Sequence, residues 1–377
     1  MPLHETLSGY WQTIQCRLFP WLEEDFGPLG ERHKQFVTVL ELVRVEMFVR
    51  HWYGVPGCPR KDRAALARAF MAKAVFNIPL TNMLIERLGV DKTLRRLCGW
   101  ERPGAVPSEA TFSRAFAEFA KSALPNRLHE VLIARTHENR LVGHISRDST
   151  AIKAREKPLK IATPEKKKRK RGRPRKGEES PKERRRLERQ PGMSLPAMLA
   201  DLPRHCAVGT KRDAKGYKTS WIGYKLHLDV ADGGIPISCL LTSASLHDSQ
   251  AAIPLATITA ARTRSLYDLM DSAYDAPEIR GHSRSLGHVP IIDVNPRSKP
   301  DLKQELADEA RRRKRAGYRL AEDVRYNERS TVERANGRLK DDFGGKFVRV
   351  RGHDKIMCHL MFGVLALTVE QLMRLLM

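Results

Sequence analysis

The sequence predicts an α/β fold, with a mixed β-sheet flanked by helices over residues 140–377 and an all-α region over residues 1–139. Three observations support this prediction. Apolar residues recur at helical spacing before residue 140, whereas short β-branched runs alternate with helical segments after it. A strongly basic stretch, which we expect to be disordered, interrupts the second region at about residues 155–215.

The amino-terminal region is helical in pattern over residues 36–139. Val39, Leu42 and Val43 follow the spacing of one helix face. A Pro-Ser pair ending at Ser108 is typical of a helix start. We therefore expect a helical domain, which could serve to recognise a partner or to act as a scaffold.

The first strand is predicted over residues 141–153, which read L-V-G-H-I-S-R-D-S-T-A-I-K and carry Asp148. Their β-branched residues suit a buried strand. Residues 223–242 follow as a β-hairpin, because alternating apolar residues flank the turn sequence Asp232-Gly233-Gly234. Asp248 then precedes a helical segment, which we expect it to cap.

A second strand-end carboxylate is expected in S-L-Y-D-L-M-D-S-A-Y-D-A-P-E-I, which contains Asp268, Asp271 and Asp275. The apolar run from Leu266 to Met270 ends at Asp271, so Asp271 is our choice and Asp268 is the alternative. The sequence D-A-P-E predicts that Asp275 caps a helix. A further strand is predicted at V-P-I-I-D-V.

A polar stripe marks the helix predicted next, where the chain reads Y-N-E-R-S-T-V-E-R-A-N-G-R-L-K. Four polar side chains fall within roughly 60° of one another at about 100° per residue, and apolar residues cluster on the far side. The four are Tyr326, Arg329, Glu333 and Lys340. A solvated amphipathic helix with an ion pair between Arg329 and Glu333 would give the same pattern.

This stripe also resembles the YREK signature of a large group of bacterial insertion-sequence transposases, because all four residues and all three gaps match. In that family the Glu is the last member of a DDE metal triad on a ribonuclease H-like fold. Asp148 and Asp271 match the two aspartates that the family places at strand ends. The predicted order of strand, hairpin, helix, strand, helix, strand and helix is also that of a ribonuclease H-like core.

The resemblance implies a mechanism and a set of site residues. Asp148, Asp271 and Glu333 would hold two Mg²⁺ or Mn²⁺ ions, since hard divalent ions prefer carboxylate oxygens and a metal pair supports in-line displacement at phosphorus. Arg329 and Lys340 would contact phosphates. Tyr326 would pack near the bound transposon end. Residues 1–139 resemble the helical DNA-binding region that recognises the element's ends in relatives, and a helical scaffold or dimerisation domain is the alternative.

Charge is consistent with a nucleic-acid substrate. The chain has 68 Lys and Arg against 44 Asp and Glu, a net charge of +24. Residues 166–189 hold 14 cations and 4 anions. Within them Arg171, Arg173 and Arg175 resemble an AT-hook core, which would insert into the minor groove of A·T-rich DNA. A generic phosphate-binding arm is the alternative.

Other patterns exclude some classes of protein. The six cysteines lack a C-x-x-C pair, so a zinc module is not predicted. The apolar carboxyl-terminal segment is interrupted by polar residues, which favours a buried helix over a membrane span. We therefore expect no membrane partner and a cytoplasmic, nucleoid-associated bacterial protein.

The predicted function is a transposase that binds the ends of an insertion sequence, cleaves DNA and transfers strands. Its partners would be double-stranded DNA, as terminal inverted repeats and target, and a second copy of the chain on paired ends. The alternative is a catalytically silent domesticated transposase or an AT-hook-like DNA-binding protein. A metal-dependent nuclease that does not join strands would share the same catalytic residues.

Overall fold

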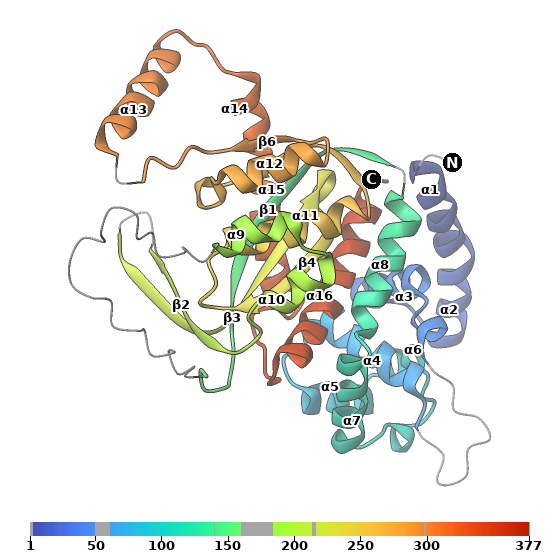
Figure 1. Ribbon diagram of the computed structural model, residues 1–377. Helices are drawn as coiled ribbons and strands as arrows, with labels where there is room; N and C mark the ends of the chain where they lie inside the picture. Colours follow the sequence, from blue (N-terminus) through green and yellow to red (C-terminus); the bar gives the residue numbers. More distant parts are fainter. Residues whose placement is uncertain are drawn as a thin grey trace.

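A computed structural model describes residues 3–49, 61–138, 140–159, 184–212, 216–297 and 299–376. A twisted β-sheet lies at its centre, with helices on both faces and the amino-terminal helices gathered at one side (Figure 1). This arrangement is the predicted mixed sheet flanked by helices with an all-α amino-terminal region.

The amino-terminal region is helical, as its apolar spacing predicts. Ser108 precedes the helix that it was expected to start. The helices are α1 (Leu3–Thr13), α2 (Phe19–Phe26), α3 (Glu31–Val43), α4 (Arg63–Val75), α5 (Thr81–Val90), α6 (Lys92–Cys98), α7 (Glu109–Lys121) and α8 (Leu124–His137), with short helical turns η1 (Ile14–Leu18), η2 (Val45–Phe48) and η3 (Pro103–Ala105).

The described strands form one six-stranded mixed sheet. They are β1 (Leu141–Lys153), β2 (Ala207–Arg212), β3 (Lys218–Ala231), β4 (Ile235–Ser243), β5 (Arg264–Met270) and β6 (Val289–Ile292). Strand β3 pairs antiparallel with β1, β2 and β4, whereas β1, β5 and β6 run parallel. The predicted strands at β1, β5 and β6 and the β3–β4 hairpin, which turns at η5 (Asp232–Gly234), are confirmed.

Helices cover both faces of this sheet. Helix α11 packs against β3 and β4 on one face, whereas α15 packs against β1 and β3 on the other. The carboxyl-terminal helices are α9 (Arg186–Arg189), α10 (Leu195–Asp201), α11 (Ser249–Ala260), α12 (Pro277–Ser285), α13 (Pro300–Arg315), α14 (Ala321–Tyr326), α15 (Ser330–Asp342) and α16 (His353–Arg374), with turns η4 (Gln190–Gly192), η6 (Ser272–Tyr274) and η7 (Asn327–Arg329). Helices α13 and α14 project away from the sheet (Figure 1).

The expectation of disorder through residue 215 is wrong for residues 184–212. These residues form α9, α10 and the sheet strand β2. They are anchored by Gln190, whose side-chain amide donates to the Gln250 carbonyl at 2.8 Å, and by Arg186, which pairs with Asp201 at 2.7 Å. The prediction based on high charge therefore extended the disordered stretch too far, because residues 184–212 also carry apolar side chains, such as Met198, that are buried.

Helix α16 joins the two regions of the chain. It is long and apolar enough to cross a membrane, but 83% of its apolar window is buried inside the protein. It packs against α3, α4, α7 and α8 as well as β4 and α15, so the amino-terminal helices and the sheet share one hydrophobic core. The predicted buried helix is confirmed, and it acts as the common centre of that core.

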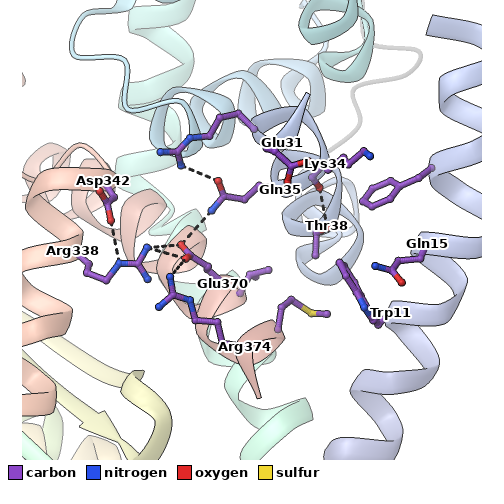
Figure 2. A pocket seen from close by; sticks show the side chains of 14 residues that line it. Trp11, Gln15, Glu31, Lys34, Gln35, Thr38, Arg338, Asp342, Glu370 and Arg374 are labelled. Carbon is purple, nitrogen blue, oxygen red and sulfur yellow. Dashed lines mark hydrogen bonds and ion pairs between the residues drawn. The ribbon is translucent and has the colours of Figure 1, made fainter. Parts of the chain in front are cut away.

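A polar seam fastens α15 to this centre. Glu370 of α16 accepts hydrogen bonds from Arg338 of α15 at 2.8 Å, from Arg374 at 2.8 Å and from Gln35 of α3 at 3.2 Å (Figure 2). These groups border a cavity of about 690 Å³ between α1, α3, α15 and α16. Because Glu370 is saturated by protein donors, the seam serves to hold helices together.

A buried ion pair ties together the strands at the centre of the sheet. The Arg147 guanidinium on β1 donates to both carboxylate oxygens of Asp229 on β3, at 2.7 and 2.6 Å, and both side chains are almost fully buried. Its remaining nitrogen lies 3.4 Å from the Met270 sulfur on β5. Thr259 of α11 also donates to Asp229 at 2.6 Å. One guanidinium therefore links its own strand β1 to β3 and β5, and Asp229 extends the contact to α11.

Removing one partner of this pair should be strongly destabilising. We expect Asp229→Asn to lower the free energy of unfolding by about 3–5 kcal/mol, because Arg147 would stay buried without a counter-charge. Replacing both partners, in Arg147→Met with Asp229→Leu, should cost less than the single change. Glu309→Gln, which breaks an exposed pair with Arg313, serves as the control, with an expected loss below about 1 kcal/mol. Urea unfolding measures all three, and wild-type stability of Asp229→Asn would contradict the account.

Candidate active site

Two carboxylates lie side by side where the parallel pairing of β1 with β5 ends, at what we call the acidic edge of the sheet. Arg147 of β1 and Met270 of β5 are register partners, so the residues that follow them, Asp148 and Asp271, are neighbours across adjacent strands. Adjacent strands lie about 4.8 Å apart. Because successive side chains alternate across a sheet, Arg147 faces the α11 layer and Asp148 faces the α15 layer.

The environment of Asp148 opposes its ionisation. Burial, together with the nearby carboxylates of Asp271 and Asp248, raises the pKa of Asp148 to about 6, although the Ser149 backbone N–H and Arg329 lower it. A buried carboxyl with an elevated pKa beside two like charges is typical of functional sites. A bound cation would relieve this repulsion.

Asp271 is fixed by the turn that follows β5. Its side chain accepts a hydrogen bond from the Ala273 N–H at 2.9 Å, which caps the 3₁₀ turn η6. Burial raises the pKa of Asp271 despite this bond and the proximity of Arg329. The alternative residue, Asp268, is buried against Ser283 and His288. The geometry therefore favours Asp271 over Asp268 as the partner of Asp148.

The two predicted helix caps are wrong. Asp275 does not cap α12, since Ala276 occupies that position and Asp275 instead pairs with Arg280 at 3.0 Å. Asp248 precedes α11 without a capping hydrogen bond, and it accepts from Lys225 at 2.8 Å. Asp275 thus pairs with a cation of α12 itself, whereas Asp248 pairs with a cation of β3, and in both cases the ion pair replaces the capping bond.

Asp248 is a third carboxylate near the site, although its sequence context favoured a helix cap. It influences the ionisation of both Asp148 and Asp271. Burial disfavours its own charge, but His227 and Lys225 outweigh burial and lower the pKa of Asp248. Its sequence signal, an acidic residue before a helix, is indistinguishable from that of an ordinary cap.

The predicted stripe lies over this edge but is not one regular helix. Tyr326 ends α14, the 3₁₀ turn η7 follows, and α15 begins at Ser330. The Ser146 hydroxyl of β1 donates to the Glu328 carbonyl in η7 at 3.0 Å, which attaches the turn to the strand that carries Asp148. The Tyr326 hydroxyl donates to Asp293, just beyond β6, at 2.6 Å.

The Glu333 carboxylate forms an ion pair with Arg329. Arg329 donates to it at 2.6 Å, and the Glu333 side chain is 52% exposed. No group of three or more His, Cys, Asp or Glu residues close enough to hold a metal occurs in the part of the chain that the structure describes. The fold thus brings Asp148 and Asp271 together and places Glu333 on the overlying helix, held by Arg329 through the i,i+4 pair.

Lys340 continues the site along α15. Burial and the neighbouring Lys211 lower the pKa of Lys340, while Asp148 acts in the opposite direction. Lys153 at the end of β1 is a further like-charged neighbour. Lys153 and Lys211 were not predicted as site residues, because isolated lysines in strands carry no distinctive pattern. The AT-hook-like residues Arg171, Arg173 and Arg175 lie outside the described residues.

Comparison with known protein families gives two matches. The family described as "Transposase DDE domain" matches residues 143–369, which include most of β1 and most of α16. The family described as "Transposase domain (DUF772)" matches residues 22–118 in the amino-terminal helices. No curated protein and no solved structure matches significantly. Because the first match spans more than half of the chain and contains the paired aspartates, the chain belongs to the DDE transposase family, whose members are metal-dependent DNA-cutting enzymes.

Proposed function

We propose that this chain is an insertion-sequence transposase of the YREK group that cleaves DNA at the element's ends and transfers the freed strands, with Asp148, Asp271 and Glu333 as its acidic triad. The observation that carries the proposal is the pairing of Asp148 with Asp271 beneath the helix that bears Glu333. The family match supports the reaction class. The order of strand, hairpin, helix, strand, helix, strand and helix supports a ribonuclease H-like core.

The residues of this edge fit a divalent metal. Asp148 and Asp271 offer hard oxygen donors, and the raised pKa of each carboxyl reflects a site that disfavours uncompensated negative charge. Mg²⁺ or Mn²⁺, as two ions, would supply activation of the attacking oxygen and stabilisation of the leaving one. Asp148, Asp271 and Glu333 would hold them, and Glu333 would have to exchange its bond with Arg329 for that role.

The remaining residues act on the DNA. Arg329 would be free to grip a phosphate once Glu333 is engaged, and its guanidinium can bind two phosphate oxygens at once. Lys340 would neutralise a neighbouring phosphate. Tyr326 would lie against the transposon end, while its hydroxyl anchors α14 to Asp293. A homodimer on paired inverted repeats would bring two such sites to the two ends.

One observation favours the alternative, a catalytically silent DNA-binding protein. The Arg329–Glu333 pair leaves the triad unassembled among the described residues. The two functions differ in a single assay, because only the transposase cleaves and joins labelled DNA that carries the element's ends.

The acidic triad should be essential for cleavage. We expect Asp148→Asn, Asp271→Asn and Glu333→Gln each to abolish Mg²⁺-dependent cleavage of labelled end DNA, while DNA affinity changes little. A double variant should be scarcely worse than a single one, since the three act as a unit. Glu328→Gln, on the exposed turn beside the triad helix, is the matched control and should keep activity. Normal cleavage by Asp271→Asn would move the second ligand to Asp248 or Asp268.

The ionised Asp148 carboxylate should lower the stability of the metal-free protein, so the effect should depend on pH. Its pKa is raised from 3.8 to about 6, so its contribution to native stability is present below about pH 4 and is lost as the pH rises through about 6. Asp148→Asn should therefore stabilise the metal-free protein near neutral pH, by up to about 3 kcal/mol. The gain should vanish near pH 4.

Thermal melts with and without Mg²⁺ measure this effect without any activity assay. Added Mg²⁺ should stabilise the wild type more than Asp148→Asn, because a ligand that binds the native state raises its stability. A variant that is less stable than the wild type at neutral pH would show that Asp148 is not electrostatically strained.

Tyr326 should matter for DNA contact more than for the fold. If its ring stacks on a base, Tyr326→Ala should lose roughly 1–3 kcal/mol of binding to end DNA, and Tyr326→Phe should keep most cleavage. Asp293→Asn separates the hydroxyl's anchoring role from the ring's role. A large fall in melting temperature for Tyr326→Ala, with normal cleavage by the folded fraction, would place the ring in the core.

A further inference from the structure

A basic cleft of about 430 Å³ lies where the amino-terminal helices meet the segment that connects α15 to α16. It is lined by residues of α4, α5 and α7, by the turn after β1, and by the first turns of α16. Its cationic or titratable lining residues are Lys73, Arg155, Arg349, Arg351, Lys355 and His359. Glu109 is the one carboxylate among its described lining residues.

Alternating apolar and basic residues in the segment between α15 and α16 form part of the wall of this cleft. In the connecting segment Val348 is buried in the core and Val350 packs against it, whereas Arg349 and Arg351 are exposed. Period-two alternation of this kind places the two arginines on the same side of an extended chain. The Gly352 N–H donates to Glu156 at 3.3 Å. This bond attaches the segment to the turn after β1.

The positive charge of the cleft is not neutralised internally. Arg155, Arg349, Arg351 and Lys355 form no ion pair with a carboxylate in the described ranges of the chain. Lys73 is buried, and its ammonium donates to the Pro79 carbonyl at 3.2 Å. Burial lowers the pKa of Lys73 to about 8, so a bound anion would favour its charged form. The exposed cations therefore keep their capacity for an external polyanion.

Lysines lie between the cleft and the carboxylate site along the chain and near α15. Lys153, at the end of β1, and Lys211, on β2, are electrostatic neighbours of Lys340, which in turn neighbours Asp148. A strand rises about 3.3 Å per residue, so β1 carries the chain about 17 Å from Asp148 to Lys153. That length corresponds to about five base-pair steps of a duplex, which advances 3.4 Å per step. Arg155 and the cleft lie beyond this point.

We propose that the basic cleft holds the sugar–phosphate backbone of a DNA duplex whose reacting phosphodiester lies at Asp148 and Asp271. Arg155, Arg349, Arg351 and Lys355 contact successive phosphates, and the run Lys340, Lys211 and Lys153 bridges the cleft to the acidic edge. A free phosphate or polyphosphate shares the same chemistry, but a line of unpaired cations that leads to a cleavage site suits an extended polyanion. The assignment rests on the proposed function.

Salt-dependent DNA binding tests the proposal. Fluorescence anisotropy of a labelled duplex several helical turns long is measured over a salt series with the full-length chain. Arg349→Gln with Arg351→Gln should weaken binding and reduce the slope of log K against log salt by about 1.8, since each phosphate contact contributes about 0.9. Arg349→Lys with Arg351→Lys keeps both charges and should keep the slope.

The matched control removes two exposed cations of the carboxyl-terminal region that do not line the cleft. Arg264→Gln on β5 with Arg284→Gln on α12 lowers the net charge equally and should leave the slope unchanged. An equal fall in slope for both double variants would mean that only overall charge matters, and would overturn the cleft. Titration with tripolyphosphate forms the other arm. Weaker tripolyphosphate binding by Arg349→Gln with Arg351→Gln, with the DNA slope intact, would make the cleft a small-anion site and overturn the proposal.

Two further measurements separate this proposal from the catalytic one. Asp148→Asn should keep the wild-type slope, and the Arg349→Gln and Arg351→Gln double variant should still cleave at saturating DNA. If the wild type does not cleave DNA, the proposed catalytic function is wrong, and the binding result remains valid. Phosphate-ethylation interference should place the cleft's contacts at least about five base pairs from the cut, and contacts confined to the cut itself would contradict the assignment.

Discussion

The buried fork between Arg147 and Asp229 is the interaction on which the candidate site depends. It links β1 to β3, reaches Met270 on β5 and is held from α11 by Thr259. Asp148 follows Arg147, and Asp271 follows Met270. The buried ion pair therefore helps to fix the alignment of β1 and β5 at the two residues that immediately precede Asp148 and Asp271. Such a pair is costly to desolvate, which is consistent with a role in defining one arrangement of strands.

The other constraint is the attachment of α15. Its apolar side packs into the shared core through Val332 and Leu339, and Gly363 of α16 allows the close approach, because a Cβ there would lie 2.5 Å from the Phe343 carbonyl. The Glu370 seam adds a polar link to α3 (Figure 2). The position of Glu333 above the sheet is thus coupled to the amino-terminal helices through contiguous packing.

The described surface around the site has an acidic part, at Asp148 and Asp271, and a basic part, which extends from Lys340 to the cleft. Burial and like charges raise the pKa values of Asp148 and Asp271, while unpaired lysines and arginines extend from Lys340 towards the basic cleft. Glu333 pairs with Arg329 because an exposed carboxylate binds a guanidinium one helical turn away. Metal and DNA would each offer one member of this pair a better partner.

The sequence by itself determined the element types and the candidates for chemistry. Periodicity located the amino-terminal helices, β1, the hairpin and β5, because that signal is local. Residue spacing marked the stripe that carries Glu333, and the resemblance of that stripe to the transposase signature led to Asp148 and Asp271. Only the tertiary structure decided that Asp248 and Asp275 bind cations instead of capping helices, that residues 184–212 fold, and that Arg349 and Arg351 share a cleft with Lys73. Each of these outcomes is a competition between alternative partners, from 5 residues away for Asp275 and 23 for Asp248 to another region of the chain for Lys73, and a local pattern does not show which partner prevails.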